Sequence, residues 1–241
     1  MSDTPTIQSS AGKLGVLLPG FGAVATTFVA GVENVRRGLA TPVGSVSQMQ
    51  TIRLGKRTEG RTPKIKDFVD LTPLDALVFG AWDPIADDGY ESALRAGVLD
   101  KHEHVEPIRD FLSSIKPMKA AFDTKYVKKL NGPNVKQAAD KKELAEQLRE
   151  DIRTFKAEHD CDRLVMVWCG STEIFLRPGA DHETIEAFEA AMEANSDQIA
   201  PSMLYAYAAL MEGVPYANGA PNLSADIPAL EQLAKEKGVP I

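Results

Sequence analysis

The sequence predicts an α/β fold with a mostly parallel sheet, and two observations support this. Short aliphatic runs, typical of strands buried on both faces, occur at Leu14–Leu18, Leu77–Phe79 and Leu164–Trp168. Between and after these runs lie longer segments in which apolar residues recur at helical spacing. Strands that alternate with helices form βαβ units, whose strands run parallel. The sequence contains no internal repeat and no low-complexity segment.

The composition sets the class of protein. The 241 residues are 44% hydrophobic and 25% charged, close to the average of soluble globular proteins. A chain of this length can form one large domain or two small ones. These values exclude a wholly disordered chain, a collagen-like chain and a disulfide scaffold. The 34 acidic and 27 basic residues give a net charge of −7, which argues against general affinity for nucleic acid or anionic membranes.

The clearest helix is predicted over Lys141–Glu158. Leu144, Leu148, Ile152 and Phe155 recur there at spacings of four, four and three, which places one apolar stripe on a polar helix. A further helix is expected directly after the first strand, where Thr27, Phe28, Val29 and Val32 are spaced helically. Three more are expected over Ala187–Asn195, Pro201–Glu212 and Ile227–Lys237.

The last helix has recognisable ends. Asp226 is the expected N-cap, Pro228 lies in the first turn, and Gly238 occupies the position of a C-cap glycine. Val239–Ile241 then begins an extended apolar segment. We expect that this polypeptide is the front portion of a longer protein, because a native chain rarely stops at the start of a strand.

Three segments are predicted outside this pattern. Met1–Gly12 is a polar, flexible lead that lacks the apolar core of a signal peptide. Ser45–Leu54 could form a second strand, followed by a polar loop over Gly55–Lys66. Ile115–Asn134 is expected to be a long surface connection with one short helix.

A glycine-rich loop follows the first strand. Gly20–Ala25 reads G-x-G-x-x-A, in which Gly20 permits a tight turn and Gly22 allows a pyrophosphate to approach the backbone. Ala25 lets the following helix pack closely, and the helix N-terminus offers N–H groups to an anion. This position between strand and helix is the one that a dinucleotide site requires. The alternative is an ordinary glycine turn.

An acidic residue about 20 residues later usually binds the ribose. Val43–Gln50 contains no acid, and Glu33 lies within the helix. Asp83, just past the second apolar run, could serve instead, because ligands bind at the carboxyl ends of parallel strands. The alternative role of Asp83 is to cap a turn or a helix.

The third apolar run ends in Trp168-Cys169-Gly170-Ser171-Thr172-Glu173. Small and hydroxyl-bearing residues at this position allow close contact with a ligand, whereas Ser171 or Thr172 could equally cap a helix. Cys169 has no histidine placed in sequence to activate it. With only Cys161 in addition, the thiols are expected to be reduced and the compartment cytosolic.

No metal site or complete catalytic set is predicted. His102 and His104 are two residues apart, which places them on different faces of a helix. Their acidic and basic neighbours indicate a solvated surface. The basic stretch from Lys119 to Lys142 could bind a phosphate, although a solvated helix face is the preferred interpretation.

Several segments occur together in one order: Leu14–Thr27, Phe79–Asp83, Lys116–Asp123, Leu130–Gly132, Val167–Glu173, Pro201–Ala208 and Asn218–Asn222. In this combination the chain resembles the front part of the inositol-3-phosphate synthase (myo-inositol-1-phosphate synthase) family, especially its bacterial form. The resemblance implies a Rossmann-type, doubly wound NAD-binding domain over residues 13–241 that continues past Ile241.

The resemblance also implies an activity, that of an intramolecular lyase in inositol and phospholipid biosynthesis. The family converts D-glucose 6-phosphate into 1D-myo-inositol 3-phosphate. It oxidises C5, enolises at C6, closes C6 onto C1 and reduces the C5 ketone, so that NAD is regenerated. A cytoplasmic homotetramer is implied, with no nucleic acid or membrane partner. The catalytic lysines and the tetramerisation sheet are expected past Ile241, so this chain alone should be inactive.

Carried over position by position, the resemblance implies a set of NAD-binding residues: Gly20, Phe21, Gly22, Ala23, Val24, Asp83, Ala120, Ala121, Asn131, Cys169, Gly170, Ser171, Thr172, Gly219 and Ala220. Many members carry glycines and asparagines where this chain has Ala23–Ala25, and Thr-Ala-Asn-Thr where it has Cys169–Thr172. Backbone hydrogen bonds could therefore replace side-chain ones. Two alternatives stay open: a stand-alone NAD-binding or regulatory module, and an ordinary NAD-dependent oxidoreductase.

Overall fold

The structure, a computed structural model, describes residues 9–241, which form a five-stranded parallel sheet. Its order is β3-β2-β1-β4-β5, so the chain winds outward from β1 to one edge and then from β4 to the other. This is a doubly wound sheet, in which the carboxyl ends of β1 and β4 flank the point where the winding reverses. The strands are β1 Leu14–Pro19, β2 Leu77–Asp83, β3 Met118–Lys119, β4 Arg163–Trp168 and β5 Tyr216–Asn218.

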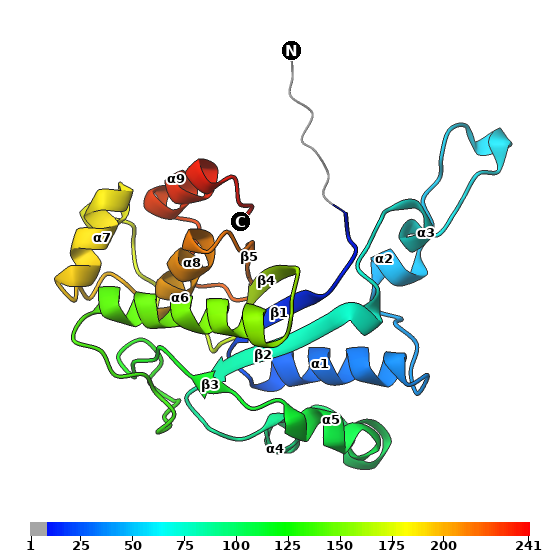
Figure 1. Cartoon of the computed structure of the whole chain (residues 1–241), viewed down its shortest axis with the longest axis horizontal. Helices are drawn as coiled ribbons and strands as arrows, with labels where there is room; N and C mark the ends of the chain where they lie inside the picture. The colour runs from blue at the N-terminus through cyan, green and yellow to red at the C-terminus, as the bar shows by residue number, and fades with distance from the viewer. Residues whose placement is uncertain (1–8) are drawn as a thin grey trace.

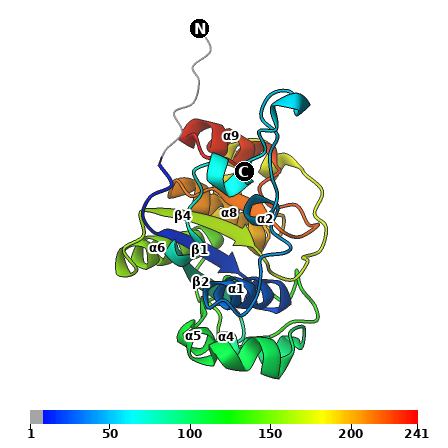
Figure 2. The same cartoon turned by 90° about the vertical axis from the view of Figure 1, so that its right-hand side faces the viewer.

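Helices cover both faces of the sheet (Figures 1 and 2). Helices α1, α4 and α5 cover one face, and α6, α8 and α9 cover the other. The α-helices are α1 Ala23–Arg36, α2 Val46–Met49, α3 Ile65–Phe68, α4 Gly89–Ala96, α5 Arg109–Ser114, α6 Lys141–Glu158, α7 Ile185–Glu193, α8 Pro201–Met211 and α9 Pro228–Lys237. Shorter helical turns lie at Arg57–Glu59, Leu74–Ala76, Lys101–Val105, Glu106–Ile108 and Ala180–His182.

Alternate residues of β1 and β2 enter two separate cores. Val16 and Phe79 are buried beneath α1 and α5, whereas Leu17 and Trp82 point to the opposite face, toward α6 and α8. Successive side chains of a strand point to opposite faces of a sheet, so each strand contributes to both layers. This double burial explains why the strands are short, continuous apolar runs.

Most predicted elements are confirmed, including the strands at Leu14, Leu77 and Leu164 and the helix over Lys141–Glu158. The other predicted helices begin or end within two residues of their expected bounds. Gly238 adopts the left-handed conformation of a C-cap, with φ at 65°. The predicted N-cap is wrong, because Ile227 holds that position while the Asp226 carboxylate accepts a hydrogen bond from Ser224 N–H.

The strand predicted at Ser45–Leu54 is wrong. The segment begins with α2 and then makes a single antiparallel bridge, from Thr51 to Lys64. Residues 43–69 form an arm that projects away from the sheet (Figures 1 and 2). The position beside β1 is taken by β2, whose longer apolar run is buried on both faces, while Val46 of the arm stays exposed.

The short helix predicted within Ile115–Asn134 is also wrong. This segment contains β3 instead, which extends the sheet beyond β2 at Trp82 and Asp83. Ala120 and Ala121 follow β3 and are buried, whereas most of residues 123–133 are exposed and form the predicted surface connection. Of the flexible lead predicted over residues 1–12, residues 1–8 lie outside the described chain, and Ser10 donates hydrogen bonds to Asp70.

Candidate functional site

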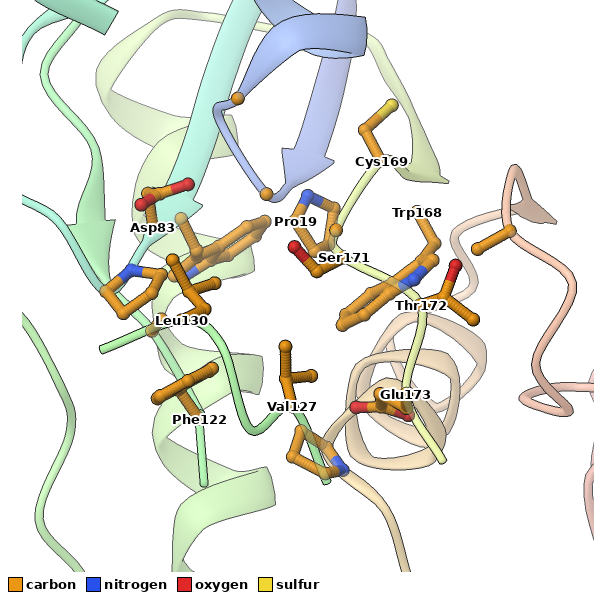
Figure 3. Close-up of a pocket in the computed structure, with 18 of the residues that line it drawn as sticks. Pro19, Asp83, Phe122, Val127, Leu130, Trp168, Cys169, Ser171, Thr172 and Glu173 are labelled. Atoms are coloured by element: carbon orange, nitrogen blue, oxygen red, sulfur yellow. The ribbon is translucent and has the colours of Figure 1, made fainter. Parts of the chain in front are cut away.

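A cavity of about 420 Å³ opens at the carboxyl ends of β1, β2, β4 and β5, where the winding of the sheet reverses (Figure 3). Three loops form its wall: the glycine loop after β1, the segment after β3, and the loop after β4. Pro221 and its neighbours after β5 close one side. Crevices at this position are where doubly wound domains bind nucleotides.

The glycine loop has a conformation that requires glycine. Gly20 has a φ of +90°, and its N–H donates a hydrogen bond to the Trp82 carbonyl over 2.8 Å. A Cβ atom on Gly20 would lie 2.3 Å from Cα of Gly170 in the loop after β4. The two loops are therefore in contact through a pair of glycines, at a distance that no side chain permits.

The N-terminus of α1 faces the cavity. Gly22 is its N-cap and has no side chain to accept the free N–H groups of the first turn, and that turn contains no acidic residue. Ala23 and Val24 of the first turn line the cavity. Free N–H groups and the positive end of the helix dipole together make an anion-binding position.

Asp83 ends β2 and holds the glycine loop in place. Its Oδ2 accepts a hydrogen bond from Phe21 N–H over 2.7 Å, and its Oδ1 accepts one from Ile85 N–H over 2.9 Å. The carboxylate is buried, and this burial raises the pKa of Asp83 despite the two N–H donors. Each oxygen keeps a second lone pair, which a ligand hydroxyl can use.

Asp83 has the capping role that the sequence left open, and its position also suits the ribose-binding role. It caps a turn at Ile85, and it also lies at the carboxyl end of the strand next to β1, in the wall of the cavity. This is the position from which an acid binds ribose in a doubly wound domain. The arm and its flanking residues lie between α1 and β2, so Asp83 falls 62 positions after Phe21. A search for an acid about 20 residues after the glycine loop therefore does not find Asp83.

The loop after β4 runs along the cavity as extended chain. Cys169 N–H donates to the Pro19 carbonyl over 2.9 Å, which fixes this loop beside the glycine loop. No described helix begins at Ser171 or Thr172, so their alternative role as helix caps is wrong. Burial raises the pKa of the Cys169 thiol to about 11, so this residue is a poor nucleophile at neutral pH.

Three aromatic side chains form the floor of the cavity. Tyr205 of α8 packs edge-on against Trp82 at a centroid distance of 5.4 Å, and its ring lies tilted against Trp168 at 5.6 Å. The Tyr205 hydroxyl accepts a hydrogen bond from Ala121 N–H over 3.0 Å, which fixes the segment after β3. Trp168 Nε1 is buried, and within residues 9–241 it has no hydrogen-bond partner.

The loop after β5 completes the wall. Gly219 N–H donates to the Trp168 carbonyl over 3.0 Å, and a Cβ atom on Gly219 would lie 2.6 Å from that oxygen. A glycine at this position therefore allows the loop to approach β4 closely, and Ala220 then faces the cavity.

All but two of the residues that the sequence predicted for cofactor binding line this cavity. Phe21 does not, because its side chain is fully buried in the core beneath α1; its backbone N–H instead meets Asp83. Asn131 lines a neighbouring hollow, where its Oδ1 accepts a hydrogen bond from Gly132 N–H.

The sequence prediction omitted several lining residues: Trp82, Arg95, Phe122, Val127, Leu130, Trp168, Glu173, Pro201 and Tyr205. Most are apolar and read as core residues in a pattern analysis. Glu173 is different, since an acid that directly follows Cys169–Thr172 is a detectable signal. The four histidines lie outside the cavity, and the described residues contain no cluster of metal ligands.

These features fit a dinucleotide. The uncapped start of α1 suits a pyrophosphate, and Asp83 suits a ribose hydroxyl. A Cβ atom on Gly22 would meet no described atom within 4 Å, so the space beside the loop is open to a ligand. Fold and site together define a dinucleotide-binding domain of the doubly wound type.

Comparison with known proteins makes this more specific. Residues 14–241 match the sequence model of the NAD-binding domain described as myo-inositol-1-phosphate synthase. The chain belongs to this family, and NAD is the cofactor that the matched domain binds.

Two curated relatives and one solved structure agree with this family assignment. Inositol-3-phosphate synthase 1 of Bacteroides thetaiotaomicron is 47% identical over 98% of this chain and 54% of its own length. The enzyme of the same name from Oryza sativa is 32% identical over 93% of this chain and 47% of its own. The crystal structure of inositol-3-phosphate synthase from Caenorhabditis elegans superposes with a TM-score of 0.85 at 27% identity, over 94% of this chain and 48% of that one.

The chain thus spans about half the length of the curated relatives that it matches. Among residues 9–241, no helix is both long enough and apolar enough to cross a membrane.

Proposed function

We propose that this chain supplies the NAD-binding part of an inositol-3-phosphate synthase, which converts D-glucose 6-phosphate into 1D-myo-inositol 3-phosphate. The observation that carries this proposal is the agreement between the family match and the geometry of the cavity. The family match covers residues 14–241, and all but two of the residues that the family resemblance assigns to NAD line one cavity at the sheet's reversal point. NAD, when bound, accepts a hydride from the sugar and later returns it, so the net reaction is an isomerisation.

The residues of this chain bind and orient the cofactor. The N–H groups at the start of α1 hold the pyrophosphate, and Asp83 accepts a hydrogen bond from the adenosine ribose. The loops after β4 and β5 would hold the nicotinamide nucleotide, and Tyr205 belongs to the aromatic floor beside them. That floor and the segment after β3 exclude water from one side of the cavity.

The sugar chemistry is assigned to the half of the relatives that this chain does not span. The described residues that line the cavity include no lysine or histidine, and burial holds Cys169 in its protonated form. We therefore expect the 241-residue chain to bind NAD without turning over glucose 6-phosphate. The complete enzyme is proposed to be a cytoplasmic homotetramer, in line with the family.

A calorimetric titration of the 241-residue chain with NAD tests the proposal, with glucose 6-phosphate turnover assayed on the same sample. Saturable binding at one site per chain, without turnover and without consumption of NAD, is the expected result. Net reduction of NAD by a sugar or alcohol would indicate an ordinary oxidoreductase. A folded chain, established by circular dichroism, that fails to bind NAD would contradict the proposal.

A further inference from the structure

Glu173 is a carboxylic acid in an unusual place. It directly follows the loop after β4, and only 4% of its surface is exposed. Burying a carboxyl group is costly unless hydrogen bonds compensate for the lost water. The partners that provide this compensation all belong to other segments of the cavity wall.

The two oxygens of Glu173 are bound by the first turn of α8. Oε1 accepts a hydrogen bond from Ser202 N–H over 3.0 Å, and Oε2 accepts one from Ser202 Oγ–H over 2.5 Å. Ala200, the N-cap of α8, has no side-chain oxygen to accept these groups. Glu173 lies in a loop, and it therefore caps the positive N-terminal end of α8 from outside that helix.

Asn222 connects Glu173 to the loop after β5. Its Oδ1 accepts a hydrogen bond from Glu173 N–H over 3.3 Å, and its Nδ2 donates to Glu173 Oε2 over 3.4 Å and to Ser202 Oγ over 3.2 Å. Asn222 and Ser202 are both buried. One closed network, which we call the Glu173 latch and define as Glu173, Ser202 and Asn222, thus joins three segments.

These segments all line the same half of the cavity. The loop Cys169–Thr172 precedes Glu173, Gly219 and Ala220 precede Asn222, and Pro201 precedes Ser202. A doubly wound domain binds one mononucleotide on each side of its reversal point. The β1–β3 side contains Asp83, and the β4–β5 side contains the latch.

We propose that Glu173 is a positioning residue for the nicotinamide half of the site, which it organises by holding the loops after β4 and β5 against the start of α8. This inference rests on the NAD-binding function proposed above. The adenosine half, bound by the glycine loop and Asp83, does not depend on the latch.

Comparison of two ligands separates positioning from general stability. NAD occupies both halves of the site, whereas ADP contains only the adenosine and diphosphate groups. Calorimetry measures the dissociation constant of each ligand for the wild type, Glu173→Ala, Glu173→Gln and Ser202→Ala. Thermal unfolding of each variant establishes that it is folded at the temperature of the titration.

We expect Glu173→Ala to weaken NAD binding about tenfold or more, because it leaves Ser202 and Asn222 with buried unpaired groups. ADP binding should stay within about twofold, since its contacts lie on the other side. Glu173→Gln keeps an acceptor for Ser202 N–H and should retain NAD binding to within about threefold. Ser202→Ala should fall between the two.

Equal weakening of NAD and ADP, or unchanged NAD binding in folded Glu173→Ala, would overturn the inference. If Glu173→Ala does not fold, the ratio of NAD to ADP affinity in Ser202→Ala decides, and an unchanged ratio overturns it. A wild-type chain that binds ADP but not NAD, or neither ligand, contradicts the proposed function itself. The two failures are distinguishable. Failure of the inference is seen in variants of a wild type that binds NAD, whereas failure of the proposed function is seen in the wild type itself.

Discussion

Asp83 Oδ2 accepts a hydrogen bond from the backbone N–H of Phe21 over 2.7 Å, which joins the end of β2 to the glycine loop across 62 positions in the sequence. The same carboxylate faces the cavity in which NAD is proposed to bind. One residue therefore shapes the glycine loop, which we propose receives the pyrophosphate, and has acceptor oxygens suited to a ribose hydroxyl.

Asp83→Ala should weaken NAD binding about tenfold or more, because it removes the ribose acceptor and releases the glycine loop. It should also lower the free energy of unfolding by about 1–2 kcal/mol, since two N–H groups lose their acceptor. Calorimetry and urea denaturation measure the two effects. Asp75→Asn, at an exposed acid outside the cavity, is the matched control, and NAD affinity equal to that control would remove Asp83 from the site.

The same carboxylate should discriminate against NADP. A negative charge beside the ribose repels a 2′-phosphate, so we expect NADP to bind at least about tenfold more weakly than NAD. Asp83→Asn keeps one acceptor oxygen while removing the charge, and should reduce this ratio. Competition titrations of both nucleotides against the variant measure it, and an unchanged ratio would assign the discrimination to another group.

Gly20→Ala should destabilise the domain by about 2 kcal/mol or more and abolish NAD binding. The substitution combines an unfavourable φ of +90° with a contact of 2.3 Å to Gly170 Cα. Gly38→Ala separates the two causes, because Gly38 has a φ of +69° but no described atom within 4 Å of its Cβ position. Urea denaturation should give only about 1 kcal/mol for this control. Equal losses in the two variants would show that the contact between the loops is unimportant.

Stability should depend on pH through Glu173. Burial raises the pKa of Glu173 from 4.5 to about 7, the opposing effects being the Ser202 hydrogen bonds and the charge of Lys141 on α6. The folded state therefore holds this proton more tightly than the unfolded state does. The resulting stabilisation is fully present below pH 4.5 and is lost as pH rises through 7.

This effect is isolated by comparing the wild type with Glu173→Gln, which does not titrate. As pH rises from 4.5 through 7, the wild type should lose up to about 3 kcal/mol of unfolding free energy relative to the variant, with no further change once Glu173 is fully ionised. Denaturation midpoints across this range provide the measurement. A constant difference between the two proteins would mean that Glu173 keeps its ordinary pKa.

Cys169 should react slowly with alkylating reagents at pH 8. Burial raises the pKa of its thiol to about 11, so only about one molecule in a thousand carries the reactive thiolate. The rate of iodoacetamide labelling, followed by mass spectrometry, should rise as pH approaches 10 and fall when NAD is added. Fast labelling at pH 8, or labelling that NAD does not slow, would place Cys169 outside the cofactor site.

The sequence alone was sufficient for the elements whose pattern arises within one segment. Lys141–Glu158 was predicted correctly because Leu148 and its neighbours form an apolar stripe of helical period, and that period is a local property. The strand at Leu14 and the glycine loop after it were predicted for the same reason. Several family motifs in one order then supplied many of the loop residues that line the cavity, but not its aromatic floor.

Only the tertiary structure decided which segments meet. Ser45–Leu54 has a plausible strand pattern, yet the place beside β1 belongs to β2, because competition for a sheet position depends on burial across the whole domain. Asp83 and Phe21 were each named from the sequence, but their hydrogen bond depends on that pairing. Glu173 appeared as an ordinary acid until the fold brought Ser202 and Asn222 to it, since a buried network is a property of distant segments and leaves no periodic signal in any one of them.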